Sequence, residues 1–358
     1  MKEKRNSPKN VILIVAVSIL LGLSSWYLYT QNKALKAQHA FQQQKLEQQR
    51  ALIEATRSSG MVSLMAELLR KADEEIKLSP DRSLSDELIA QIASLSHDLT
   101  PYQNVIGDSL SAAKLSPERG QLLLMLVNMN IDSASFAKIK LQTSFEAADL
   151  AGANLNEAPL QGALLKGANL REAVLRRANL QGTNLYQAQL WGADLYKASL
   201  TDADLKRADM SWANLNESDL RRADLCSAIL NSAQLNQADL RNTLFKWAYL
   251  NDASAQGSNF QDANLLRTEL SRADMSEANL THANLKRTII REANFSGTIL
   301  KGTNLIDAAM LHTVVSAKDW MEQLDTWKVV GAESLQERFD LVKENTAQPS
   351  YRLEKPRE

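Results

Sequence analysis

The sequence predicts an all-β solenoid, in which the chain winds repeatedly around one buried axis. The first observation is a column of apolar residues at every fifth position from Phe145 to Val315. All 35 positions hold Leu, Phe, Met, Ile or Val except Ala255. The second is a companion column two residues earlier, which holds 25 Ala, 8 Thr and 2 Ser. Neither column shifts frame, so one small unit repeats without insertion.

A five-residue period excludes the two common regular structures. On an α-helix, five residues advance about 500°, so successive members of the column would scatter around the cylinder. On a flat strand, successive members would alternate between the two faces. A chain that turns a corner after every five residues instead points the whole column at one axis. Four such units close a square coil, and neighbouring coils pair at about 4.8 Å.

The residue before the apolar position is Asn or Asp in 19 of the 35 cases, as in Ala153-Asn154-Leu155. This pattern resembles the A(D/N)LXX motif of the pentapeptide-repeat family, and it covers about half of the chain. The resemblance implies the right-handed quadrilateral β-helix of that family. Some membrane-anchored members also have, before their repeats, a segment that resembles residues 115–122, LSPERGQL.

The N-terminal segment predicts a membrane anchor. Residues 1–10 include four basic residues, and an uncharged apolar run follows from Val11 to Tyr29. A helix of this length rises about 28 Å, close to the thickness of a hydrocarbon core. The basic residues before the run place the N-terminus in the cytoplasm and the repeats outside it, as in a single-pass protein of the inner membrane. A cleaved signal peptide, with Gly22 and Ser24 before the cut, is the alternative.

The remaining segments indicate how the solenoid is flanked. A Gln- and Lys-rich stretch is typical of a solvated stalk helix, with a self-associating coiled coil as the alternative. Three helical patterns follow, the second with Ser83 or Ser85 as N-cap and the third opening with Ser116-Pro117. The open ends of a solenoid need such small helical caps. The predicted boundaries are a basic end at 1–10, a transmembrane helix at 11–29, a stalk at 30–60, an N-terminal cap at 61–131, the repeats at 132–315, a C-terminal cap at 316–344 and a polar tail at 345–358.

Composition and motif content argue against an enzyme. Cys226 is the only cysteine, so the chain has neither an intramolecular disulfide nor a four-cysteine zinc site. The four histidines have no metal-ligand spacing, and no phosphate-binding glycine motif occurs. Stacked coils would bring carboxylates together, as with Asp204 and Asp224, but Asp and Asn at this repeated position are expected to bond local turn amides. We therefore expect no catalytic residue, no metal and no cofactor.

Unrolling the repeats into four faces indicates a candidate partner-binding surface. One face carries seven basic and four acidic residues, an excess of three positive charges. Exposed aromatic residues beside arginines are typical of binding surfaces. A mixed, solvated face is the alternative, because acidic residues are interleaved with the basic ones. The candidate residues are Lys206, Arg207, Lys246, Trp247, Arg267, Lys286 and Arg287 on this face, and Trp191 and Trp212 on another.

These features predict a non-enzymatic, membrane-tethered scaffold that presents a rigid β-helical rod to a protein or envelope partner. The sequence does not identify the partner, and it leaves self-association through the stalk or the solenoid ends open. Some pentapeptide-repeat members resemble duplex DNA and bind DNA gyrase, so a topoisomerase-interacting DNA mimic is the first alternative. The repeats have 17 basic and 19 acidic residues, a poor match to a phosphate backbone, and no nucleic-acid partner is expected. A β-helical carbohydrate-active enzyme is the second alternative, although no insertion supplies a cleft.

Overall fold

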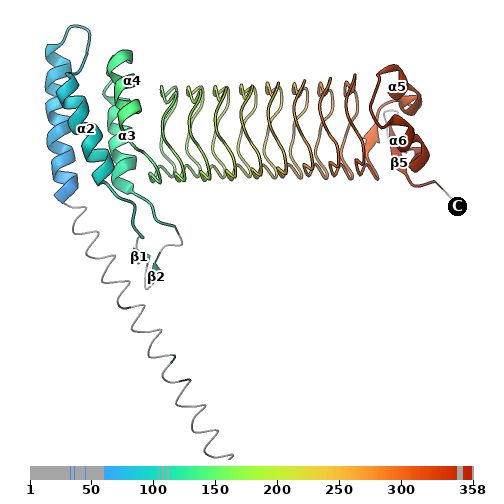
Figure 1. The fold of residues 1–358 in the computed structure, drawn as a ribbon, viewed down its shortest axis with the longest axis horizontal. Coiled ribbons are helices and arrows are strands. Elements are labelled where there is room, and N and C mark those ends of the chain that lie inside the picture. The colour runs from blue at the N-terminus through green and yellow to red at the C-terminus, as the bar shows by residue number, and fades with distance from the viewer. Residues whose placement is uncertain are drawn as a thin grey trace, which may run out of the picture. The chain divides into compact units, whose positions relative to one another are not determined.

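The computed structural model describes residues 60–103, 113–344 and 350–356, the backbone of residues 105–106 and 109–110, and the single positions 33, 36 and 45. The chain divides into two compact units, one of Met1–Arg57 with Gln103–Ala112 and one of Ser58–Tyr102 with Ala113–Glu358. In the first unit, the described strands are β1 (Val105–Ile106) and β2 (Ser109–Leu110), which pair antiparallel. The second unit holds the repeats and the elements at their two ends (Figure 1).

The predicted transmembrane helix, Val11 to Tyr29, lies outside the described residues, as do residues 1–10 and most of the predicted stalk. Within the described ranges, no helix combines the length and the apolar composition needed to span a bilayer. The helix at 60–78, for example, carries seven charged residues between Glu67 and Lys77. This finding contradicts the predicted single-pass location in the inner membrane, which is therefore withdrawn.

In the second unit, several helices precede the repeats. The helix at 60–78 is followed by α2 (Asp86–Asp98), α3 (Pro117–Asn128) and α4 (Ser133–Gln142) (Figure 1). Two predicted N-caps are confirmed. Ser85 accepts a hydrogen bond from the Leu88 N–H at 3.4 Å, and Ser116 accepts one from the Arg119 N–H at 3.2 Å. The apolar faces of these helices join the same buried cluster as the repeats.

Residues 133–142, which the predicted boundaries place in the repeats, form α4 instead. Asp132 caps this helix, because its carboxylate accepts hydrogen bonds from the Ala134 and Ser135 N–H groups at 2.9 and 3.1 Å. Phe136 and Ile139, three residues apart on one helical face, are both buried. The segment thus matches the repeat in composition, but the capping carboxylate and the helical spacing of its apolar residues determine its structure.

From Phe145 onward the chain forms a stack of coils (Figure 1). Parallel bridges join each residue before the apolar column to the residue twenty positions later, from Asp149–Asn169 to Asn294–Val314. Each coil therefore contains four five-residue units, as the repeat predicts. Hydrogen bonds run to both neighbours of a coil, because consecutive N–H groups donate in opposite directions along the stack. This ladder fixes the register of every coil against the next.

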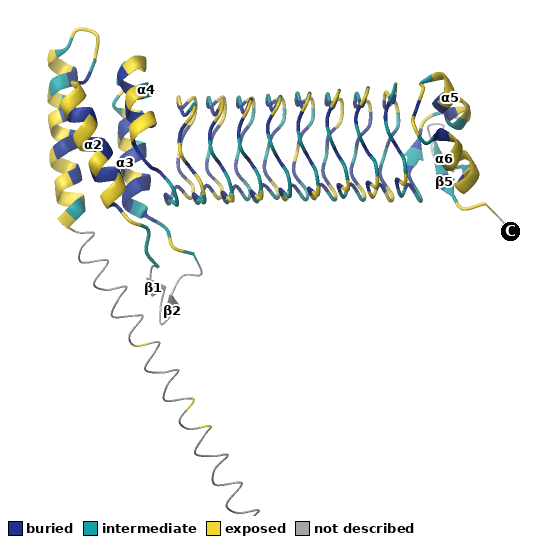
Figure 2. Cartoon of the chain, viewed as in Figure 1, coloured by how far each residue is buried: buried dark blue, intermediate teal, exposed yellow. Residues whose placement is uncertain are grey.

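The apolar column and its small companion fill the inside of every coil (Figure 2). Leu215 and Ala213, for example, have no exposed surface. Where Thr replaces Ala, the buried hydroxyl donates to the carbonyl of an apolar residue on the preceding coil, as Thr243 Oγ1 does to Leu220 O at 2.9 Å. This hydrogen bond satisfies a polar group that burial would otherwise leave unpaired. The companion column therefore accepts Thr as well as Ala.

Each corner places a left-handed residue two positions after the apolar column. Every such residue from Ala147 to His312 has a positive φ. Eight of them are glycines, but 26 have side chains, including Trp247 at 57° and Arg267 at 58°. This conformation costs about 1 kcal/mol or more for a residue with a Cβ, and the ladder on both sides of the corner enforces it. Corners therefore accept small, charged and aromatic side chains, although the glycines at eight of these positions suggest that the conformation requires glycine.

Helix α3 closes the first coil. A parallel bridge joins Ser116 to Ala148, and the Ser116 carbonyl accepts the Asp149 N–H at 3.1 Å. Gly120 lies so close to the coil that a Cβ on it would stand 2.0 Å from the Asp149 carbonyl oxygen. A glycine is therefore required for α3 to reach the exposed edge and cover it.

The opposite end is closed by two helices and a sheet. The sheet has the strand order β3-β5-β4, with antiparallel pairing throughout. The elements are β3 (Val314–Val315), α5 (Trp320–Thr326), α6 (Ala332–Arg338), β4 (Asp340–Lys343) and β5 (Tyr351–Glu354). The prediction of a polar tail is thus wrong at 351–354, where Leu353 is fully buried in the central strand. One apolar residue between charged neighbours gave no strand signal.

Leu215→Asp should unfold the central coils, because a carboxylate at this fully buried position has no partner on the axis. We expect the free energy of unfolding, measured by urea denaturation of the full chain, to fall by about 4 kcal/mol or more. Asn216→Asp is the matched control. Its side-chain oxygen accepts the Asn236 N–H at 2.9 Å, and a carboxylate keeps that bond. The variant loses only the exposed bond from Asn216 Nδ2 to Gln234 Oε1, so the change should stay within about 1 kcal/mol. Equal losses in the two variants would contradict the buried axis.

Lys140 predicts a pH-dependent stability. Its Nζ donates to the Pro159 carbonyl at 2.7 Å and lies 5.1 Å from the centre of the Phe136 ring. Burial lowers the pKa of this lysine from 10.5 to about 8 in the folded protein. Between these two pH values the unfolded state binds more protons than the folded state. The contribution of Lys140 to the free energy of unfolding should therefore rise with pH across this window, by about 3 kcal/mol at most. Cys226, whose pKa is raised from 9.0 to about 11, gives an opposing fall above about pH 9 that is the same in a Lys140 variant.

Lys140→Met should remove this rise. The pKa values of Lys197 and Lys206 are raised, chiefly by side-chain hydrogen bonds to Tyr196 and Asp204 respectively, so their contributions change only above pH 10.5. Urea denaturation of both full-length proteins between about pH 7 and pH 10.5 measures the effect. A constant difference in unfolding free energy between wild type and variant over this range would show that Lys140 does not titrate as proposed.

Candidate interaction surface

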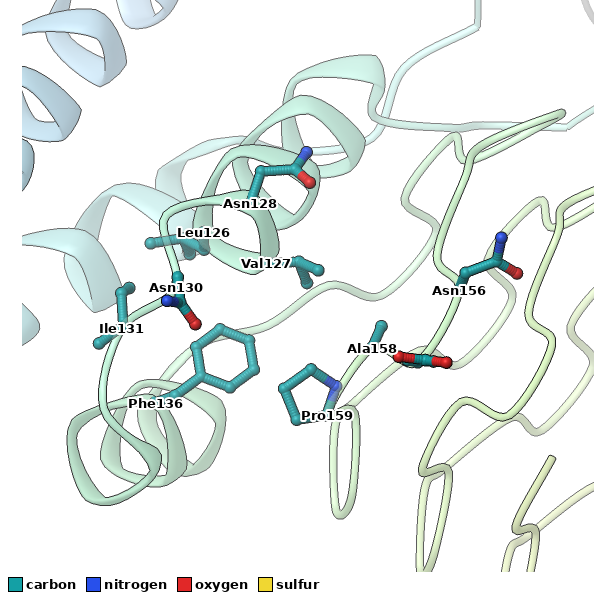
Figure 3. A pocket seen from close by; sticks show the side chains of 10 residues that line it. Leu126, Val127, Asn128, Asn130, Ile131, Phe136, Asn156, Ala158 and Pro159 are labelled. Carbon is teal, nitrogen blue, oxygen red and sulfur yellow. The ribbon is translucent and has the colours of Figure 1, made fainter.

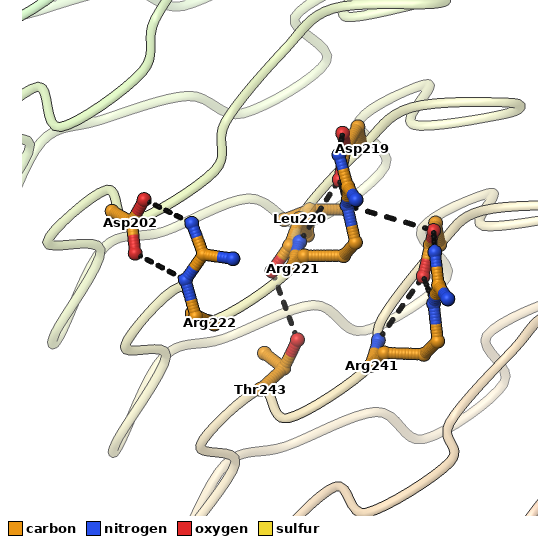
Figure 4. A network of polar contacts seen from close by, with 8 residues as sticks. Asp202, Asp219, Leu220, Arg221, Arg222, Arg241 and Thr243 are labelled. Carbon is orange, nitrogen blue, oxygen red and sulfur yellow. Dashed lines mark hydrogen bonds and ion pairs between the residues drawn. The ribbon is translucent and has the colours of Figure 1, made fainter.

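The outer faces of the coils carry paired charges. Asp204 and Asp224 lie one coil apart, as predicted, and Lys206 Nζ lies 3.1 Å from the first carboxylate and 3.6 Å from the second. Asp219 and Asp239 are stacked in the same way, and each binds an arginine two positions later (Figure 4). In the part of the chain that the structure describes, no group of three His, Cys, Asp or Glu side chains could hold a metal ion. The carboxylates of Asp204, Asp224, Asp219 and Asp239 instead form ion pairs with lysine or arginine.

Asp and Asn before the apolar column make the local bonds that the sequence predicts. Asp204 Oδ1 accepts the Lys206 N–H at 3.2 Å, and Asn264 Oδ1 accepts the Leu266 N–H at 3.2 Å. The same bond recurs along the stack, with the acceptor two residues before the donor. Its role is to hold the turn that follows each short strand.

At two corners, an arginine binds both carboxylate oxygens of an aspartate on the preceding coil through its Nε and Nη2 atoms. Arg222 Nε and Nη2 lie 2.7 and 2.6 Å from the two carboxylate oxygens of Asp202 (Figure 4). Arg272 binds Asp252 with the same two distances. Hydrogen bonds from these arginines lower the pKa of both aspartates. One coil of separation therefore suits a bidentate arginine–carboxylate pair.

The predicted basic face differs from these paired corners over three consecutive coils. We call Lys246, Trp247, Arg267, Lys286 and Arg287 the open basic patch. Among the described residues, no carboxylate lies within ion-pair distance of the first lysine, of Arg267 or of Lys286, and Arg287 reaches only Asp307, with Nε 3.4 Å from Oδ2. The tryptophan between them is 49% exposed. The patch therefore combines uncompensated positive charge with an accessible aromatic ring.

The residues before the apolar column explain why this patch lacks acids. In the earlier coils of the same face these positions hold Asp204 and Asp224, whereas in the following coils they hold Leu244, Asn264 and Asn284. Amides preserve the local turn bond but contribute no negative charge. Lys206, which was predicted with the patch, is instead neutralised by its two aspartates. Its neighbour Arg207 is exposed and lies in the same column of corner residues as Arg267 and Arg287.

The predicted aromatic residues Trp191 and Trp212 lie on a different face. The ring of Trp191 stacks with Arg171, whose guanidinium carbon is 5.1 Å from the ring centre. Trp212 is a corner residue with φ of 61° and is 63% exposed. Tyr249 lies on this face with the two tryptophans, as the sequence indicates, and is stacked one coil from Ile229; both are partly exposed. Sequence reasoning missed Ile229, whose signal was an apolar residue in the position that usually holds Asn or Asp.

The hollow beside the helical cap and the Cys226 thiol offer no catalytic arrangement. A hollow of about 350 Å³ lies between the helical cap and the first coil. Phe136, Pro159 and the amides of Asn128, Asn130 and Asn156 are among the residues that line it (Figure 3). Glu157 is the titratable side chain among the residues that line it. Burial, with Asp224 nearby, raises the pKa of Cys226 to about 11, so this thiol stays protonated and weakly nucleophilic at neutral pH.

Comparison with known proteins agrees with this geometry. The family model for pentapeptide repeats matches eight copies that together span residues 141–310. HetL, a pentapeptide repeat protein involved in heterocyst differentiation regulation in the cyanobacterium Nostoc sp. strain PCC 7120, is 35% identical. That match covers 46% of this chain and 84% of HetL, with a TM-score of 0.33. No curated protein matches the chain.

Two further solved structures show the range of the resemblance. The pentapeptide repeat protein alr5209 from Nostoc PCC 7120 is 32% identical over 24% of this chain and 69% of its own, with a TM-score of 0.23. QnrB1, a plasmid-mediated fluoroquinolone resistance protein, is 16% identical over 45% of this chain and 83% of its own, with a TM-score of 0.29. The repeated motif, the coil register, the family model and the 35% sequence identity to HetL agree, and this chain belongs to the pentapeptide-repeat family.

Proposed function

We propose that this chain is a non-enzymatic interaction scaffold, in which the stacked coils hold surface side chains at fixed spacing for a protein partner. The open basic patch is the observation that supports this function. Among the described residues, Lys246, Arg267 and Lys286 make no ion pair, and Arg287 has one contact with Asp307. Desolvated aromatic and arginine side chains supply much of the binding energy in protein interfaces. A partner that supplies carboxylates would complete the pairing that the other corners achieve internally.

The backbone supports a scaffold because it leaves the surface little freedom to rearrange. Both N–H and C=O groups of each short strand bond to adjacent coils, and the corner φ values fall in one narrow range. A partner therefore meets side chains that are already positioned, which reduces the entropy lost on binding. Rigidity of this kind favours recognition of one complementary surface.

The charge layout does not favour a DNA mimic. The face that carries the open basic patch has the opposite sign to a phosphate backbone, and the corner aspartates Asp202 and Asp252 are paired with arginines. A mimic requires uncompensated negative charges in a regular row. We accordingly retain a protein-binding scaffold as the proposed function.

The full-length chain, immobilised on beads in an extract of its own cells, tests this proposal. The triple variant K246Q/R267Q/R287Q removes three charges from the open basic patch. R222Q/R241Q/R272Q is the matched control, because it removes three charges that are already paired with aspartates. A partner bound through the patch should be depleted about tenfold or more by the first variant and little by the second, and should rebind the wild-type chain when purified.

Two outcomes would overturn the proposal. Failure of every retained protein to rebind in purified form would show that the chain is not a scaffold under these conditions. Equal retention by the two triple variants, with direct rebinding intact, would instead place the binding surface elsewhere on the chain. Circular dichroism of each variant controls for loss of the fold.

A further inference from the structure

We propose that Arg267 and Arg287 form a docking site for the carboxylates of an acidic segment in a partner protein, with Trp247 as the apolar contact beside them. This inference rests on the proposed scaffold function and adds the chemistry of the partner. It follows from a comparison of these corners with others in the same stack.

The paired corners show what an arginine at this position can do. Arg222 and Arg272 occupy the same corner position in their units as Arg267, with φ values of 60°, 59° and 58°. Each of the first two reaches back one coil and binds both oxygens of an aspartate, at 2.6 and 2.7 Å. The corner backbone therefore presents the guanidinium in a geometry that suits a carboxylate about one coil away.

At the open basic patch the position one coil back holds no carboxylate. It is Trp247 for Arg267, and it is Arg267 itself for Arg287. On the other side, Arg287 makes one contact with Asp307, from Nε to Oδ2 at 3.4 Å, which leaves most of its donors unused. The adjoining column contributes Lys246 and Lys286. The guanidinium groups of Arg267 and Arg287 thus lack the bidentate aspartate partner that Arg222 and Arg272 have.

Neighbouring amides do not fill this role. Asn264 Oδ1 accepts the Leu266 N–H at 3.2 Å and the amide of Asn284 at 3.3 Å. Asn284 Oδ1 in turn accepts the Lys286 N–H at 3.2 Å. These oxygens are engaged along the stack and carry no charge. Within the described ranges, the single Asp307 contact to Arg287 is the one ion pair that these two arginines make. The proposed site therefore takes its further carboxylates from another molecule.

The size and composition of the patch favour a protein segment over a nucleic acid or an acidic polysaccharide. Three coils span only about 10 Å along the stack, which accommodates a few carboxylates but not the many phosphate contacts on which nucleic-acid affinity depends. The carboxylates that the same corner geometry binds within this chain are aspartates. Trp247, at 49% exposed, offers an apolar surface next to the arginines, and Trp with Arg is the composition of protein-binding hot spots.

Fluorescence anisotropy with the full-length chain tests the site directly. The probe is a fluorescein-labelled peptide of glutamates with interspersed leucines, and the control peptide has glutamine in place of every glutamate. We expect R267Q and R287Q each to weaken binding of the glutamate peptide about fivefold or more. R272Q removes the same charge from the same coil as R267Q at a corner already paired with Asp252, and it should change binding less than about twofold.

The variant R267K separates the arginine fork from net charge. Lysine keeps the positive charge but cannot bind a carboxylate with two parallel hydrogen bonds, so R267K should also weaken binding, by about threefold. Unlabelled polygalacturonate and a single-stranded oligodeoxynucleotide serve as competitors that represent the other sources of anionic groups. Both should displace the peptide less effectively than the unlabelled glutamate peptide does.

Several results would overturn the docking site. They are equal effects of R267Q and R272Q, binding of the glutamine peptide as tight as that of the glutamate peptide, wild-type affinity in R267K, and stronger displacement by either competitor. A partner retained by the wild-type chain and rebinding in purified form, together with any of these results, would leave the scaffold function standing and refute this site alone.

Discussion

The structure depends on one constraint, the hydrogen-bond ladder that joins each strand residue to the residue twenty positions away. This ladder fixes the corners and turns every apolar column residue inward. The companion column stays small because it shares that interior, and a Thr hydroxyl fits there by bonding to a carbonyl such as that of Leu220. Each coil thereby depends on its neighbours, so local damage should spread along the stack rather than through a globular core.

The same ladder organises the surface charges. A residue and its counterpart one coil later lie side by side. Opposite charges at this separation therefore form ion pairs with little loss of side-chain conformational entropy. Asp202 with Arg222 and Asp252 with Arg272 illustrate the arrangement. Charge then remains available only where the counterpart is neutral or of like sign, as at Arg267. Exposed pairs of this type contribute little stability individually, and their larger effect is to determine where a charged partner can bind.

The period of the sequence predicted the coil length, the buried columns and the stacking of Asp204 on Asp224, because these follow from spacing alone. It did not predict that side chains as large as Trp247 occupy left-handed corners, since only the ladder makes that conformation acceptable. Composition misassigned the α4 segment, where the cap at Asp132 and helical spacing decide the structure. The sequence also did not show which arginines lack a carboxylate partner, because this depends on whether a neutral residue or an aspartate occupies the adjacent position on a neighbouring coil.

The strand β5 has a consequence for how the molecule is made. It lies between β3 and β4 and buries Leu353, yet it follows every coil in the chain. During synthesis, chains emerge from the N-terminal side, and domains begin to fold before translation ends. The coils can therefore assemble in order behind their helical cap while the last edge still lacks its cover. A chain truncated shortly before residue 351 would lack β5, and its last coils would expose an unpaired strand edge to which other chains can bind.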